Sequence, residues 1–233
     1  MTKVNARALV SGASSGIGAA ICRSLKQQGY HLTGIGRDFS DSGDEIDRKW
    51  VLDLCDLDAL ERALRANKNE FDLLVLAAGY GDFGGLEQFS YSQITRLINT
   101  NLIANLYLCK RFMPGMKQTN FGDIVLIGSE SALSGARAGS IYCASKFAIR
   151  GFAQSLRADC SNANIRVLLC NPGPVDTPFF DQLDFRPMQG REFSIDASDI
   201  AQAISAALNQ PRHVVTEEIQ IQPLKRSFQS NEK

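Results

Sequence analysis

The chain has 233 residues, of which 44% are apolar and 21% charged, a composition typical of a soluble globular protein long enough for one α/β domain. Its 25 basic and 25 acidic side chains are balanced and form no long run of one sign, which argues against nucleic acid as a partner. No apolar run approaches the roughly 18 residues that a membrane span needs, so we expect no membrane partner.

The cysteines indicate the redox compartment of the protein, and the histidines indicate whether it has a metal site. The six cysteines are scattered and contain no CxxC pair. The N-terminal stretch 1–15 reads as a first strand and a glycine-rich turn rather than as a leader with a cleavage site. These features predict reduced thiols and a cytoplasmic protein. His31 and His213 lie far apart without ligand spacing, so we expect no metal site.

Short apolar runs alternate with amphipathic stretches along the chain. We predict strands at 6–12, 31–37, 49–54, 71–79, 122–129, 165–173 and 217–224, and helices at 16–30, 58–70, 91–117, 142–161 and 197–210. The strands are nearly continuous apolar runs, as expected when helices cover both faces of a parallel sheet. The sequence therefore predicts a single α/β domain over 1–225, built on a doubly wound parallel sheet, and a disordered tail at 226–233.

A glycine-rich loop, "SGASSGIG", joins the first strand to the first helix. Glycines let a backbone turn tightly and approach a pyrophosphate, and the N-terminus of the helix offers free N–H groups to the anion. A tight turn without a ligand would produce the same local pattern. The position between strand and helix favours a dinucleotide site, although the spacing is G-x-x-x-G-x-G rather than G-x-G-x-x-G.

The helix at 142–161 carries Tyr142 and Lys146 four residues apart, and hence on one helical face. By themselves they could be two unrelated surface residues. As a unit they would make an acid–base pair, because a nearby ammonium favours the phenolate form of a tyrosine.

Taken together, these segments resemble the short-chain dehydrogenase/reductase family of the classical type, which has a Rossmann-type fold. The resemblance covers nearly the whole chain, from the glycine loop to "NPGPVDTP". In between it includes Asp53-Leu54, Asn101, Ser129 and the Tyr-x-x-x-Lys pair. The segment "LAAG" matches only in part, because Leu76 and Ala77 stand where the family usually has asparagines.

The resemblance implies an oxidoreductase that transfers a hydride between NADP(H) and a small carbonyl or alcohol substrate. It makes Tyr142 the acid and base and lets Ser129 hold the substrate oxygen. Lys146 would lower the pKa of Tyr142 and reach the cofactor ribose, while Asn101 would hold a water on a proton path. It also assigns cofactor contacts to Gly12, Ser14, Ser15, Gly16, Ile17, Gly18, Arg37, Asp53, Leu54, Ala78, Gly79, Pro172, Gly173, Val175 and Thr177, besides Tyr142 and Lys146.

The choice of cofactor depends on the end of the second strand, "GIGRD". Asp38 lies near the distance of about 20 residues at which an acid binds the ribose 2′-hydroxyl of NAD. However, the family's usual position for that acid is Gly36, and Arg37 follows it. A guanidinium pairs well with a 2′-phosphate, so we predict NADP over NAD. Alternatively, Arg37 is a solvated charge balanced by Asp38.

Three further expectations concern function and assembly. A dinucleotide-binding sensor or scaffold of the same fold is the alternative function, and only the altered "LAAG" favours it. The helices at 91–117 and 142–160 are expected to form a homodimer, with a homotetramer as the other assembly. The segment after Thr177 is expected to cover the site, with Phe179, Phe180, Phe185 and Met188 either lining it or packing the segment down.

Overall fold

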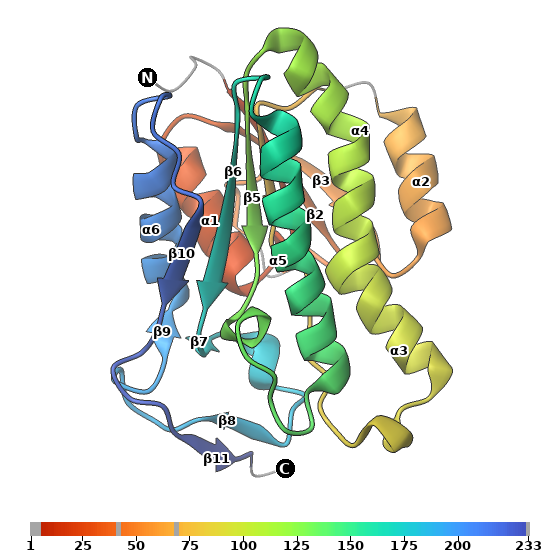
Figure 1. Ribbon diagram of the computed structural model, residues 1–233, viewed down its shortest axis with the longest axis vertical. Coiled ribbons are helices and arrows are strands. Elements are labelled where there is room, and N and C mark those ends of the chain that lie inside the picture. Colours follow the sequence, from red (N-terminus) through yellow and green to blue (C-terminus); the bar gives the residue numbers. More distant parts are fainter. Residues whose placement is uncertain (1–5, 41–42, 68–69, 232–233) are drawn as a thin grey trace.

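A computed structural model describes residues 6–40, 43–67 and 70–231 (Figure 1). Its central sheet has seven parallel strands in the order β10-β6-β5-β4-β1-β2-β3. This arrangement confirms the predicted doubly wound parallel sheet. The strands are β1 (Arg7–Ser11), β2 (His31–Gly36), β3 (Arg48–Val51), β4 (Leu73–Leu76), β5 (Gly122–Ile127), β6 (Ile165–Pro172) and β10 (Glu218–Ile221).

Helices cover both faces of this sheet (Figure 1). One face packs against α1 (Gly16–Gln27) and α6 (Ala197–Leu208), and the other against α2 (Leu57–Ala66), α4 (Ala104–Thr119) and α5 (Ser140–Cys160). Alternate residues of β1 show how the strands serve both layers: Ala8 and Val10 join the core under α1, whereas Leu9 joins the opposite core. The burial of both faces explains why the strands are apolar throughout.

The helix expected at 91–117 is divided in the structure. It consists of α3 (Tyr91–Ile98), a π-helical turn η2 (Asn99–Ile103) and α4. A π-turn inserts an extra residue into a helix and often marks a functional position. The helix expected at 58–70 ends at Ala66, and residues 68–69 lie outside the described part of the chain. Among the described helices, none is long and apolar enough to cross a membrane.

Short elements follow β6 and gather at the carboxyl edge of the sheet, at the bottom of the view in Figure 1. They are β7 (Val175–Asp176), η4 (Pro178–Phe180), β8 (Phe185–Pro187), β9 (Ile195–Asp196) and β11 (Phe228–Ser230), with η1 (Leu86–Gln88) and η3 (Glu130–Ala132) in earlier loops. β7 pairs with β9, and β11 pairs antiparallel with β8.

The C-terminal segment thus differs from the disordered tail expected at 226–233. Residues 228–230 form β11, and the N–H of Asn231 donates to the carbonyl of Asp184 at 2.9 Å. The order comes from pairing with a segment about forty residues earlier, which no local pattern reveals. Residues 232–233 lie outside the described chain.

Candidate active site

The strand order reverses between β1 and β4, so the loops after these two strands border a crevice. The N–H of Ala78 donates to Ser11 Oγ at 3.2 Å. Gly12 has a φ of +68°, and a Cβ at this position would lie 2.9 Å from Ala78 N and Cα. Only glycine allows this approach. The structure thus brings together two segments predicted to bind the cofactor, the glycine loop and the Ala78-Gly79 pair.

The helix that follows the loop begins with unsatisfied donors. Ser15 is the N-cap residue of α1, and its side chain makes no capping hydrogen bond. A Cβ on Gly18 would overlap the Gly12 carbonyl, so the loop closes tightly over the start of the helix. An open cleft of about 520 Å³ borders this point, and its walls include Ser14, Ser15 and Thr177. A helix start of this kind fits the pyrophosphate of a dinucleotide.

The opposite wall of the crevice comes from the chain after β6. Pro172 ends this strand, and the N–H of Gly173 donates to a carbonyl of β10 at 2.8 Å. Val175 is buried in β7, and Thr177 Oγ1 donates to its carbonyl at 3.2 Å. A Cβ on Gly16 would lie 3.3 Å from Thr177 Cβ, so this wall touches the glycine loop directly. Ile17 is partly buried and packs against the core under α1.

Two acidic side chains considered as cofactor ligands from the sequence, Asp53 and Asp38, already accept hydrogen bonds. Asp53 accepts the N–H of Cys55 at 3.0 Å and pairs with Arg96 at 3.4 Å, while Leu54 beside it is buried. Asp38 accepts the N–H and the hydroxyl of Ser40 at 2.9 and 3.0 Å, and these hydrogen bonds lower the pKa of the Asp38 carboxyl. Asp38 therefore stabilises the turn at residues 38–40 and, among the residues described, forms no ion pair with Arg37.

Arg37 has a different setting. It is exposed and forms no ion pair with any residue of the described ranges. A Cβ on the preceding Gly36 would lie 3.0 Å from Ser14 Oγ, which places the end of β2 against the glycine loop. Arg37 follows this contact point directly in the sequence, and Asp38 after it borders the same cleft as Ser14.

Tyr142 and Lys146 lie buried on one face of α5, with 7% and 6% of their surface exposed. Burial raises the pKa of Tyr142 to about 12, although a hydrogen bond with the Ser129 side chain opposes the rise. Burial also lowers the pKa of Lys146 to about 8. Lys146 Nζ lies 5.6 Å from the centroid of the Tyr142 ring and donates to the Ile127 carbonyl at 3.1 Å. The two residues form one unit, as their spacing suggests.

This geometry differs from one expectation. We expected Lys146 to lower the pKa of Tyr142, but the ammonium lies over the ring face and burial dominates, so the pKa rises.

Asn101 in η2 is buried and holds the loop after β4. Its Oδ1 accepts the N–H of Tyr80 at 3.0 Å, and its Nδ2 donates to the Tyr80 carbonyl at 3.0 Å and to Ser145 Oγ at 3.2 Å. A Cβ on Gly79 would lie 3.2 Å from Asn101 Oδ1 and 3.6 Å from Lys146 Nζ, so the three residues converge. The side-chain amide is committed to this clamp, and the water assigned to Asn101 stays a prediction.

The sequence missed several supporting residues. Asn171 Oδ1 accepts the N–H of Ser129 at 3.2 Å, and Asn171 Nδ2 donates to Glu218 at 2.7 Å. A polar residue inside the apolar run "IRVLLCNPG" was the available signal for Asn171. Phe83, whose ring centroid lies 5.2 Å from that of Tyr142, comes from the glycine-rich loop after β4 and had no signal beyond being a lone aromatic.

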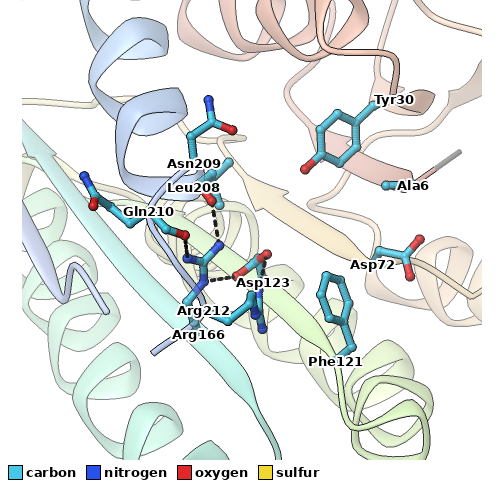
Figure 2. Close-up of a pocket in the computed structure, with 10 residues that line it drawn as sticks. All are labelled: Ala6, Tyr30, Asp72, Phe121, Asp123, Arg166, Leu208, Asn209, Gln210 and Arg212. Atoms are coloured by element: carbon cyan, nitrogen blue, oxygen red, sulfur yellow. Dashed lines mark hydrogen bonds and ion pairs between the residues drawn. The ribbon is translucent and has the colours of Figure 1, made fainter. Parts of the chain in front are cut away.

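A second polar centre lies at the amino ends of the strands, beside a cavity of about 160 Å³ (Figure 2). We call Asp123, Arg166 and Arg212 the amino-end cluster. Asp123 accepts from Arg166 Nε at 2.7 Å and from Arg212 Nη1 at 2.8 Å on both oxygens. Because the Asp123 carboxylate pairs with both guanidiniums, we interpret the amino-end cluster as an ion-pair network that stabilises the fold. Across the described ranges, no three His, Cys, Asp or Glu side chains are grouped to hold a metal ion.

Known proteins share this architecture. Residues 6–186 match the family model described as short chain dehydrogenase. The chain is 29% identical over 234 residues to an uncharacterized oxidoreductase of Staphylococcus epidermidis, an alignment that covers 96% of this chain and 100% of the relative. It is 34% identical over 188 residues to human retinol dehydrogenase 8, covering 75% of this chain and 60% of that protein.

A solved structure agrees with these relatives. An alcohol dehydrogenase from the archaeon Thermococcus sibiricus, complexed with 5-hydroxy-NADP, matches with a TM-score of 0.82 at 25% identity, over 95% of this chain and 98% of that one. The glycine loop, the uncapped helix start and the crevice at the strand reversal fit a nicotinamide dinucleotide, which is the cofactor class supported here. The chain is an oxidoreductase that belongs to the short-chain dehydrogenase/reductase family.

Proposed function

We propose that the protein uses NADP(H) to interconvert a small carbonyl compound and its alcohol, with Tyr142 as the acid and base. The observation that carries this proposal is the burial of Tyr142 and Lys146 together, with Lys146 Nζ 5.6 Å from the centroid of the tyrosine ring, at the carboxyl edge of the sheet beside the glycine loop. The nicotinamide dinucleotide, when bound, supplies or takes up the hydride. The names of two relatives, a retinol dehydrogenase and an alcohol dehydrogenase, support a carbonyl or alcohol substrate.

The residues of this chain then manage the oxygen and its proton. Ser129 donates to the carbonyl oxygen, and its own position is fixed by Asn171 and by the N–H of Ser131 at 3.1 Å. Tyr142, a phenol that is protonated at neutral pH, gives a proton to that oxygen as the carbonyl is reduced. The phenolate left behind is stabilised by the Lys146 ammonium, whose pKa of about 8 keeps it mostly charged at pH 7.

The preference for NADP(H) is part of the same proposal. Arg37 is exposed without a partner in the described chain, Asp38 is committed to Ser40, and Ser14 Oγ lies at the Gly36 backbone. A 2′-phosphate near the end of β2 would gain a guanidinium and a hydroxyl, and Gly36, the family's usual position for an acid, has no side chain to hold a ribose hydroxyl. The solved relative that holds an NADP derivative supports this choice.

The test is a turnover assay with NADPH and NADH at equal concentration on a panel of ketones, aldehydes and quinones. We expect NADPH to be favoured by roughly tenfold or more, because a charge-assisted contact is worth that much. Arg37→Ala should lose most of this preference by weakening NADPH alone, and Arg62→Ala, an exposed arginine on α2, is the matched control. Equal use of NADH by the wild type would refute the role of Arg37. Cofactor binding without turnover of any carbonyl would instead favour the sensor or scaffold.

The proposal also covers the oligomeric state of the protein and its cellular compartment. We place the protein in the reducing cytoplasm, since all six cysteines are free and five of them are buried. We propose a homo-oligomer through α5, where Phe147 is 44% exposed on a helix already expected to form a dimer contact. Light scattering during gel filtration tests this expectation, and a monomeric mass at micromolar concentration would overturn it.

A further inference from the structure

Five phenylalanine rings form a continuous chain of contacts beside Tyr142. Phe83 and Phe179 contact the Tyr142 ring, with centroids 5.2 and 6.0 Å away. Phe185 of β8 lies 5.1 Å from Phe83, and Phe228 of β11 lies 5.6 Å from Phe185. The contacts among the phenylalanines are edge-to-face, the arrangement that aromatic pairs prefer. We call Phe83, Phe179, Phe180, Phe185 and Phe228 the aromatic wall.

The end of the chain holds this wall in place. β11 pairs with β8, and the N–H of Met188 donates to the Ser227 carbonyl at 3.0 Å. Asn231 Nδ2 donates to the carbonyls of Phe180 at 2.8 Å and Leu183 at 2.6 Å. The segment 226–231 therefore fixes the turn that carries Phe179 and Phe180 as well as the strand that carries Phe185.

The same segment also reaches the catalytic serine. Arg226 pairs at 3.5 Å with Glu130, the residue directly after Ser129. The C-terminal segment thus joins the substrate side of the crevice to the loop that holds the reacting oxygen.

The basic side chains that β8 and residues 225–226 carry are already paired. Arg186 faces Asp181 at 3.8 Å, and Lys225 faces Glu192 at 3.7 Å, in addition to the pair between Arg226 and Glu130. A carboxylate-bearing substrate placed against the rings would lose its hydration without meeting an unpaired cation from these segments. An uncharged planar substrate would lose little hydration and would gain ring contacts.

We propose that the segment 226–231 is a structural part of the substrate site, in which β11 and the positioning residue Asn231 hold the aromatic wall beside Tyr142 so that it selects uncharged aromatic aldehydes or ketones over carboxylate-bearing ones. This inference rests on the proposed function and adds to it a substrate class and the element that sets it.

The experiment compares para-methylbenzaldehyde with para-carboxybenzaldehyde, which differ at one substituent. In the wild type, kcat/KM should favour the methyl compound by roughly tenfold or more. Asn231→Asp exchanges the amide donor for a carboxylate that faces two carbonyls. It should raise KM for the methyl compound by roughly tenfold, while NADPH affinity measured by fluorescence stays unchanged. Leu224→Ala is the matched control, because Leu224 lies in the same C-terminal stretch but is 87% exposed.

Hydrogen exchange gives a readout that does not need turnover. The amides of Phe185, Arg186 and Met188 should exchange faster in Asn231→Asp than in the wild type or in Leu224→Ala. Phe228→Leu, a change at a half-exposed ring, is a second variant that should still fold and should raise the same KM by a smaller factor.

Several outcomes would overturn the inference and leave the proposed function standing. Equal use of the two aldehydes would do so, as would unchanged KM and unchanged exchange in both variants. If the wild type reduces no carbonyl at all, the proposed function fails separately. Calorimetric binding of the two matching benzyl alcohols and the exchange comparison then decide the inference, and equal binding or equal exchange overturns it.

Discussion

The sheet carries a buried polar centre at each end, and the two differ in how their charges are met. In the amino-end cluster, Asp123 lies between two guanidiniums at 2.7 and 2.8 Å. In the active site, the Lys146 ammonium meets a backbone carbonyl and an aromatic ring, and it has no carboxylate partner within the described ranges. The first arrangement holds together β5, β6 and the chain after α6. The second leaves the Lys146 ammonium buried beside only a carbonyl and a ring, and burial lowers the pKa of Lys146 toward neutrality.

The largest expected effect comes from Tyr142→Phe at the reactive centre. This change removes only the proton donor, so turnover should fall by a factor of about 10²–10⁴. NADPH affinity should stay the same, because the glycine loop and Lys146 are untouched. Steady-state rates and a fluorescence titration measure the two quantities. Wild-type turnover in this variant would remove Tyr142 from the reaction.

Asp123→Ala should break the structural centre and spare the reactive one. It leaves the buried Arg166 guanidinium without its carboxylate, so the free energy of unfolding should fall by about 3–5 kcal/mol. Turnover per folded molecule should not change, because Asp123 and Arg166 lie near the amino ends of β5 and β6, away from the carboxyl edge that carries the active site.

Urea denaturation measures this loss, and Arg65→Ala is the control. Arg65 pairs with Glu61 at 2.6 Å, but both side chains are exposed, so the loss should stay below about 1 kcal/mol. Similar losses in the two variants would show that burial does not decide the strength of these ion pairs.

Lys146→Met should stabilise the protein while abolishing its turnover. The pKa of Lys146 is about 8 in the folded chain and 10.5 as its ordinary value, so the unfolded state binds more protons between these pH values. The free energy of unfolding of the wild type should therefore rise with pH through that window. The variant lacks this rise and should be more stable at pH 7 by about 1–3 kcal/mol, after the lost bond to Ile127 is counted.

Urea denaturation at pH 7 and pH 10 checks this sign, with the exposed Lys110→Met as the control. The free energy of unfolding should rise more between pH 7 and pH 10 in the wild type than in Lys146→Met. An equal change in both proteins would contradict the lowered pKa of Lys146.

The smallest effect is expected for Asn101→Ala. Removing the clamp on Tyr80 should cost about 1–3 kcal/mol of folding free energy and weaken NADPH binding several-fold, because the loop at 78–80 loosens. Asn101→Asp keeps the acceptor for the Tyr80 N–H and should recover part of the binding. Unchanged NADPH affinity in Asn101→Ala would show that the clamp does not position the cofactor loop.

Most of the fold and the main candidate site residues could be predicted from local sequence patterns. The glycine loop, the apolar strands and the Tyr142–Lys146 spacing are signals within a few residues of one another, and the structure brings them to one edge of the sheet. The π-turn at Asn99–Ile103 could not be predicted, because its amphipathic pattern differs from an α-helix by a single inserted residue.

Contacts between segments far apart in the sequence could not be predicted either. Asp123 reads as an ordinary residue of a strand until β6 and the chain after α6 bring Arg166 and Arg212 to it. The pairing of Phe228 with Pro187 joins residues whose separation gives no periodic signal, so the tail was expected to be disordered. Asn171 was visible as a polar interruption in a strand, but its partners Ser129 and Glu218 were not.

The pairing of β11 with β8 also has a consequence for the order of synthesis. A ribosome releases the N-terminus first, so the strands up to β6 and the pair of Tyr142 and Lys146 leave the exit tunnel well before residues 228–231. The glycine loop and the catalytic pair can therefore assemble on a nascent chain whose substrate side is still open. Closure of that side waits for residues 228–231, so a chain truncated before β11 would carry Tyr142 and Lys146 without the strand that pairs with β8.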